Sequence, residues 1–343
     1  MLTAIDHLEI HVIVNDELDP ISPSPNPAVK VASRFMGVPL SRLNSDTDRG
    51  GAEMEMRMDN ICCAAHGISL LLIATKDDKK HHFLFDAGPE GAVWERNSSR
   101  LRAEIGQIEH IALSHYHRDH SGGLTRAIEL INKKVGGSKG VVVDVHPDRP
   151  AYRGVQADRP ISLEADPSFE ELEAAGGTLL KSDQLHTALD DFFLISGEIP
   201  RETTYEDGIY GGLRFNDVTK QWEEDTLVTE ERYVMCNLKG LLFGHDAGKG
   251  LVVFTGCGHA GIVNTCRDAV KLGNGTPLYC VVGGYHLADA DEGKLNATME
   301  DLKKMKPQVL LAGHCTGWRF KCLIARELPN CLVPCFSGSK YTL

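Results

Sequence analysis

The chain has 343 residues, of which 42% are hydrophobic, 24% charged and 6% aromatic. This is the composition of a globular protein with enough apolar material for a buried core, and it excludes disordered and collagen-like chains. The 36 Lys and Arg residues stand against 48 Asp and Glu residues, which gives a formal net charge of −12. A chain of this charge repels polyanions, so we expect no nucleic-acid partner.

The first 20 residues lack the basic region and long apolar run of a signal peptide. No apolar run in the chain reaches the roughly 18 to 20 residues that a membrane span requires. The 10 cysteines are scattered among apolar neighbours and do not form the framework of a small secreted domain, so we expect most of them to be reduced and buried. The sequence therefore predicts a cytoplasmic protein with no membrane partner.

The sequence pattern of residues 8–115 predicts a strand, then an insertion and then the strands of a core sheet. Alternating apolar residues at 8–14 predict the first strand. Residues 19–60 are rich in Pro, Ser and Asp, and we predict a surface insertion there, which is either a lid or an irregular excursion. Three short apolar runs then predict strands at 68–75, 81–88 and 108–115.

Strands and helices alternate through the rest of the chain, as is typical of α/β proteins. Helical spacing of apolar residues predicts helices at 94–105, 124–133, 168–176, 261–272, 298–305 and 317–328. Further apolar runs predict strands at 141–148, 191–199, 231–238, 250–256, 277–284 and 308–313. Residues 200–225 predict a polar loop that contains several aromatic residues.

A histidine cluster in the sequence SHYHRDHSGG directly follows the predicted strand at 108–115. It consists of His115, His117, Asp119 and His120. Three imidazoles and one carboxylate within six residues can serve two neighbouring metal ions. A solvated polar turn is the competing interpretation, but it leaves unexplained why two later strands also end in histidine, at His259 in TGCGHAG and His314 in AGHCTG.

The His-x-His-x-Asp-His motif after a strand, with later histidines at strand ends, resembles the metallo-β-lactamase superfamily. Further segments are similar to its dihydropterin ribofuranosylaminobenzene phosphate synthase-like branch: FLFDAG at 83–88, GEIPRETTYED at 197–207, TGCGHAGIVNT at 255–265 and VVGGYHL at 281–287. The likeness spans about 61–317. It implies one domain over 1–343 with an αββα sandwich, in which two mixed sheets pack face to face under outer helices. It also implies an active-site cover at about 150–230.

The resemblance implies two metal sites at one sheet edge. The first would be held by His115, His117 and His259, and the second by Asp119, His120 and His314. Zinc is the expected metal, with iron or manganese as alternatives. The strand that commonly ends in a bridging aspartate reads VVGGYHL here. Three alternatives follow: His286 supplies a ligand, Cys257 takes part, or the second site is weaker.

Other residues are predicted to support or contact the reacting groups. Asp86, at the end of a strand, is expected to orient a ligating imidazole. His66 and His146 at strand edges, and Arg201 in a loop that the resemblance places over the site, are candidates for substrate contact, with structural roles as the alternative.

Three residues are candidates for catalytic roles. Asp119 would hold or deprotonate the attacking water. Tyr285 or His286 would donate a hydrogen bond to the developing oxyanion or to the leaving group.

These residues predict a metallo-hydrolase, with two zinc ions, that opens a small cyclic or activated carbonyl compound such as a lactam or lactone. A hydroxide formed at the metals would attack the carbonyl. The chain also resembles fungal members that open the γ-lactam of plant benzoxazolinones. His117 stands where diiron-flavin oxygen reductases carry glutamate, and the acidic balance argues against nuclease members.

Two other functions remain as alternatives. The first is a synthase or transferase that joins an aromatic unit to a pterin phosphate. It would need a phosphate site, for which Arg149, Arg153 and Arg201 are the candidates. The second is a metal-containing ligand-binding protein with little turnover.

Overall fold

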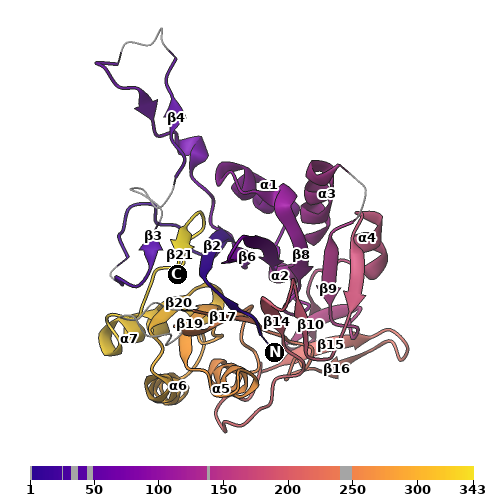
Figure 1. Cartoon of the computed structure of the whole chain (residues 1–343). Helices are drawn as coiled ribbons and strands as arrows, with labels where there is room; N and C mark the ends of the chain where they lie inside the picture. The colour runs from indigo at the N-terminus through magenta and orange to yellow at the C-terminus, as the bar shows by residue number, and fades with distance from the viewer. Residues whose placement is uncertain (1, 25, 32–37, 45–48, 137–139, 240–248) are drawn as a thin grey trace.

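A computed structural model describes the chain except for residues 1, 25, 32–37, 45–48, 137–139 and 240–248. Two β-sheets pack face to face, and helices cover their outer faces (Figure 1). One apolar layer lies between the sheets and includes Phe83, Phe193 and Phe254. A second apolar layer lies between the first sheet and its helices, and a third lies between the second sheet and its helices. The predicted αββα sandwich is confirmed.

The first sheet has eight strands among the described residues, in the order β12-β9-β8-β7-β6-β2-β21-β3. The strands β12, β9, β8 and β7 are parallel, and the remaining neighbours are antiparallel. Their bounds are β2 (His7–Val14), β3 (Lys30–Val31), β6 (Ser69–Lys76), β7 (Lys79–Phe85), β8 (Ile108–Ala112), β9 (Val142–Val145), β12 (Thr178–Lys181) and β21 (Lys340–Thr342). Strand β21 lies between β2 and β3, far from both in sequence.

The second sheet has seven strands in the described part of the chain, in the order β13-β14-β17-β18-β19-β20, with β1 paired to β17. The strands β18, β19 and β20 are parallel. Their bounds are β1 (Ala4–Ile5), β13 (His186–Ala188), β14 (Phe193–Ile195), β17 (Val234–Leu238), β18 (Gly250–Thr255), β19 (Leu278–Gly283) and β20 (Val309–Ala312).

The helices that cover each sheet pack on it through an apolar face. In α3 (Leu124–Val135), buried Leu124, Ala127, Ile128 and Ile131 recur at helical spacing and pack on the first sheet. The other α-helices are α1 (Gly91–Arg100), α2 (Arg118–Ser121), α4 (Phe169–Ala174), α5 (Ile262–Leu272), α6 (Glu292–Met305) and α7 (Trp318–Glu327). Short 3-10 helices lie at η2 (Met58–Asn60), η3 (Ile105–Gln107) and η4 (His314–Thr316). Within the described ranges, none of these helices combines the length and the apolar composition that crossing a membrane would require.

The polar loop predicted at 200–225 is wrong, because the structure has two strands there. Strands β15 (Gly212–Asn216) and β16 (Gln221–Glu224) join β10 (Tyr152–Gln156) and β11 (Pro160–Ser162) in a four-stranded antiparallel sheet. Phe215 pairs with Trp222 across β15 and β16, and this cross-strand contact outweighs the polar local sequence.

Residues 19–60 contribute to two different parts of the structure. Strand β3 joins the edge of the first sheet. Strands β4 (Ser41–Arg42) and β5 (Met54–Glu55) pair as a hairpin that projects from the body at the top of Figure 1.

The helix predicted at 298–305 begins earlier, at Glu292. The Asp291 side chain accepts a hydrogen bond from the backbone N–H of Lys294 and caps the first turn.

Candidate metal centre

Three histidine nitrogens converge between the loops that follow β8 and β18. Nε2 of His115 lies 2.9 Å from Nδ1 of His117, and Nε2 of His259 lies 3.1 Å from each of these two atoms. Three nitrogens around one tetrahedral zinc ion, each about 2.0 to 2.1 Å from the metal, lie about 3.3 Å apart. The first histidine group, His115, His117 and His259, therefore fits a metal ion.

Burial keeps this first group uncharged. It lowers the pKa of His115 and His259 well below the usual value, and it lowers the pKa of His117 to about 3. Neutral imidazoles have a free nitrogen lone pair, which is the form that binds metal. Among the described residues, Nδ1 of His259 is buried without a hydrogen-bond partner.

A second group lies beside the first and contains the other predicted ligands. Nε2 of His314 lies 3.2 Å from Oδ2 of Asp119, and Nε2 of His120 lies 3.6 Å from the same oxygen. The ligand atoms of Asp119, His120, Cys257 and His314 all lie within 4.8 Å of one another. A carboxylate, two imidazoles and a thiol are a suitable ligand set for zinc.

Cys257 also belongs to the first group. Its ligand atom and those of His115 and His259 lie within 4.8 Å of one another. The thiol lies 3.1 Å from Nε2 of His120 and 3.3 Å from Nε2 of His314. Of the alternatives for the absent aspartate, the geometry therefore favours Cys257.

The buried Asp86 carboxylate holds the outward nitrogen of His120 directly and that of His115 through Ser114. Nδ1 of His120 donates to Oδ2 of Asp86 over 2.7 Å, and Nδ1 of His115 donates over 2.9 Å to the Ser114 hydroxyl, which in turn donates to Asp86. Asp86 thus occupies the orienting position expected for it. These contacts leave Nε2 of both histidines pointing into the centre.

Asp16 plays the same part for His314, and the sequence analysis missed it. Its Oδ1 lies 2.8 Å from Nδ1 of His314, while its Oδ2 lies 2.9 Å from Nδ1 of His66. Asp16 follows β2 at the end of an apolar strand, which was the only sequence signal that could have found it.

Replacing Asp16 with Asn is expected to weaken zinc binding by about 10- to 100-fold, because the amide no longer orients His314 as a charged acceptor does. The affinity is measured by competition with a chromophoric chelator. Asp190→Asn is the control, since Asp190 is exposed and pairs with Lys79 at the surface. Equal zinc affinities for Asp16→Asn and the wild-type protein would contradict the orienting role.

The two proposed hydrogen-bond donors lie in different places. The Tyr285 ring is buried in the core, and its hydroxyl donates to the carbonyl oxygen of Val281, not to the metal centre. This corrects the expected contact with substrate. The half-buried His286 ring lies beside His259, with their ring centroids 4.3 Å apart. His286 therefore remains next to the first group.

The three candidates for substrate contact are also separated. His66 has 71% of its side chain exposed and lies at the mouth of the second group, with Nε2 3.5 Å from Oδ2 of Asp119. The half-buried Arg201 donates to the carbonyl oxygens of His259 and Leu227 and so supports the His259 loop.

His146 lies away from the two ligand groups. It lines a pocket of about 460 Å³ together with Asp183 and Glu198, and no residue of either metal group lines that pocket.

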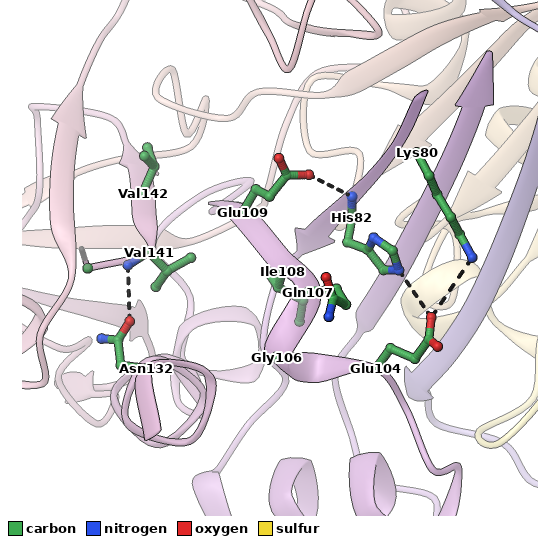
Figure 2. A pocket seen from close by; sticks show the side chains of 11 residues that line it. Lys80, His82, Glu104, Gly106, Gln107, Ile108, Glu109, Asn132, Val141 and Val142 are labelled. Carbon is green, nitrogen blue, oxygen red and sulfur yellow. Dashed lines mark hydrogen bonds and ion pairs between the residues drawn. The ribbon is translucent and has the colours of Figure 1, made fainter. Parts of the chain in front are cut away.

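A larger pocket of about 690 Å³ lies at the opposite edge of the first sheet (Figure 2). Its lining includes Lys80 near the start of β7, and Ile108 and Val142 at the starts of β8 and β9, whereas the metal groups follow strand ends. Glu104 contacts both His82 and Lys80, as Figure 2 shows. This pocket contains none of the residues of the two ligand groups, so it is separate from the candidate metal centre.

Comparisons with known proteins agree with this geometry. A sequence profile described as the Metallo-beta-lactamase superfamily matches residues 67–226. A Methanocaldococcus jannaschii protein named 7,8-dihydropterin-6-methyl-4-(beta-D-ribofuranosyl)-aminobenzene-5'-phosphate synthase is 27% identical over 276 residues, which cover 76% of this chain and 84% of that protein. An uncharacterized protein of the same organism is 29% identical over 258 residues, covering 75% of this chain and 86% of its own length.

A solved structure extends the similarity to the whole fold. The crystal structure of a metal-dependent hydrolase of the beta-lactamase superfamily has a TM-score of 0.65 and 18% sequence identity. The match covers 97% of this chain and 98% of the other. The chain therefore has the metallo-β-lactamase fold, its residues 67–226 are similar to that superfamily, and it has two adjacent groups of side chains that could hold metal ions.

Proposed function

We propose that the chain is a hydrolase with two divalent metal ions, zinc in the first place, that opens a small cyclic or activated carbonyl compound such as a lactam or lactone. The observation that carries this proposal is the pair of adjacent ligand groups at one edge of the sandwich. One group offers three neutral imidazoles, and the other adds a carboxylate and two more imidazoles.

Two metal ions held by these groups would lower the pKa of a water molecule and polarise a carbonyl oxygen. The side chains of the protein bind and orient the reactants around them. Burial alone would raise the pKa of Asp119, but the neighbouring imidazoles, foremost His120, lower it below its usual range. Asp119 is therefore a carboxylate at neutral pH and can accept a hydrogen bond or a proton from the attacking water.

Two histidines that adjoin the ligand groups are our candidates for substrate contact. His286 lies against His259 of the first group, and the exposed His66 lies against Asp119 of the second. Each carries ring nitrogens that can donate a hydrogen bond to a carbonyl oxygen or a leaving group. We assign them to substrate positioning.

The arginines that a phosphate-binding synthase would need are already engaged. Arg153 is buried and forms ion pairs with Glu230 and Asp225. Arg149 donates to the backbone carbonyls of Asp166 and Pro167. Because Arg201 also donates to backbone carbonyls, the three candidates have protein partners, and this favours the hydrolase.

A synthase remains the second candidate, because a curated relative that matches 76% of this chain bears that name. It would use the same metal groups with a phosphate-bearing substrate. A phosphate site would then have to come from residues other than these three arginines.

The proposal is tested by metal analysis together with hydrolysis assays. We expect close to two metal ions per chain when the protein is purified without chelator. We also expect ring opening of compounds in a panel of lactams, lactones and benzoxazolinone, which chelation abolishes and added zinc restores.

Two outcomes would contradict the hydrolase. The first is full loading with zinc, iron or manganese but no hydrolysis of any panel member. This result would favour a metal-containing ligand-binding protein with little turnover. Metal-dependent turnover that requires a pterin and a phosphate-bearing second substrate would establish the synthase.

A further inference from the structure

We propose that the Cys257 thiolate is a ligand shared by both metal ions and lies between them. This inference rests on the proposed two-metal hydrolase and deepens it. Within the part of the chain that the structure describes, Cys257 is the one residue that belongs to both ligand groups.

The position of the sulfur atom supports a shared role. Sγ lies 3.1 Å from Nε2 of His120 and 3.3 Å from Nε2 of His314, both from the second group. It also groups with His115 and His259 of the first. Zinc–sulfur bonds are about 2.3 Å long, so one sulfur atom can bridge two metal ions about 3.5 to 4 Å apart.

The neighbouring strand end has no room for a side chain at position 284. Gly284 follows β19, where the sequence lacks the usual aspartate. A Cβ atom on Gly284 would lie 2.5 Å from the carbonyl oxygen of Gly256 and 2.7 Å from Sγ of Cys315. Cys315 and the Cys257 loop therefore fill the space that a side chain would need at 284, and a bridging ligand would have to come from another residue.

The backbone holds Cys257 between the two groups. The Glu231 carboxylate accepts hydrogen bonds from the backbone N–H groups of Gly258, His259 and Ala260, over 2.8, 2.9 and 2.7 Å. Before Cys257, a Cβ on Gly256 would lie only 2.2 Å from the Ser114 hydroxyl oxygen. The loop is thus pressed against the histidine loop, and Cys257, only 3% exposed, is fixed there.

The chemistry of binding is balanced without an oxidant. The thiol S–H bond breaks, its proton passes to water or buffer, and the sulfur lone pairs form bonds to the metals. Sulfur keeps its oxidation state, and each metal gains a soft ligand in addition to its imidazoles.

Cobalt(II) reconstitution of the full-length protein tests this assignment. We expect the wild-type protein to bind two cobalt ions and to show a thiolate-to-cobalt charge-transfer band in the near ultraviolet. X-ray absorption should find one sulfur neighbour for each cobalt, because a shared sulfur is counted by both metals. A thiolate bound to only one metal would give an average of one half of a sulfur neighbour per cobalt ion.

Two serine variants identify the sulfur atom. Cys257→Ser should lose the band and bind the second cobalt at least about 10-fold more weakly. Cys315→Ser is the matched control, because this half-buried thiol adjoins Cys257 but belongs to neither metal group. It should keep the band. If Cys257→Ser fails to fold, the sulfur count in the wild-type protein still decides between a shared and an unshared thiolate.

Failure of the inference is distinguishable from failure of the proposed function. Three results would overturn the shared Cys257 and leave the two-metal hydrolase intact. They are two bound cobalt ions without a sulfur neighbour, an average of one half of a sulfur neighbour per cobalt ion, and a charge-transfer band that only Cys315→Ser removes. A wild-type protein that binds no cobalt would overturn both.

Discussion

An Asp119→Asn variant is expected to hydrolyse the substrate about 10²- to 10⁴-fold more slowly than the wild-type protein while keeping its fold. The carboxylate lies 3.2 Å from His314 and 3.6 Å from His120, so in the proposed mechanism it would be both a ligand of the second metal and a proton acceptor beside it. An amide of the same shape accepts no proton and is a weak metal ligand. The second metal should therefore bind less tightly in this variant.

The measurement is kcat/KM with the metal content determined on the same sample. Raising the zinc concentration should restore the second metal but not the rate, which separates the two roles of Asp119. Asp183→Asn is the control, because Asp183 is exposed in the pocket that His146 lines, and we expect wild-type turnover from it. A normal rate for Asp119→Asn at full metal loading would remove Asp119 from the mechanism.

Replacing Asp144 with Ala is expected to lower the free energy of unfolding by about 3 to 5 kcal/mol, because it leaves a buried charge without its partner. Oδ1 of Asp144 lies 2.8 Å from Arg232, and Oδ2 lies 2.6 Å from His186 and 3.2 Å from His110. Arg232 has only 1% of its side chain exposed. The measurement is urea denaturation of both proteins with the same metal content.

A double variant, Asp144→Leu with Arg232→Met, tests the reason for this loss. Since both charges are then removed together, we expect it to be more stable than Asp144→Ala alone. Lys79 and Asp190 form an exposed pair, and breaking that pair should leave stability unchanged within error. If Asp144→Ala is as stable as the wild-type protein, the buried network does not stabilise the fold.

The same carboxylate gives stability a defined pH dependence. Burial alone would raise the pKa of Asp144, but hydrogen bonds from His110, His186 and Arg232 lower it below the ordinary 3.8. A carboxyl group with a lowered pKa in the folded state stabilises the protein above its unfolded pKa. The contribution of Asp144 is therefore complete at neutral pH and is lost as the pH falls below about 4. The pH profile of Asp144→Ala should lack this loss.

The sequence was sufficient to predict the central strands, because they form continuous apolar runs that the structure buries on both faces. Strands β6, β7, β8 and β18 lie where such runs predicted them. The strands of the small sheet were missed, since side chains such as Tyr152 and Ile161 are 45% and 53% exposed and leave no clear pattern. Strand β21 has three residues, and only its pairing with distant β2 makes it a strand.

The candidate metal ligands could be predicted from the sequence because they follow apolar strands in one short motif and at two later strand ends. Their supporting residues could not, because the contacts join distant parts of the chain. Asp16 and His314 are 298 residues apart in sequence. Tyr285 was misplaced for a related reason: local sequence does not tell which side of a strand end a side chain faces, and this ring packs against Phe320 in the core.

The position of β21 bears on how the chain folds during synthesis. A ribosome makes β2 and β6 to β9 early, but it makes β21 only with residues 340–342. Strand β21 pairs with the free edge of β2 on one side and with β3 on the other. Until then, the nascent protein presents an unpaired strand edge, which is a template for pairing with other chains. Final closure of the first sheet must therefore wait until translation has passed this point, and a chaperone that shields the β2 edge would reduce misassembly.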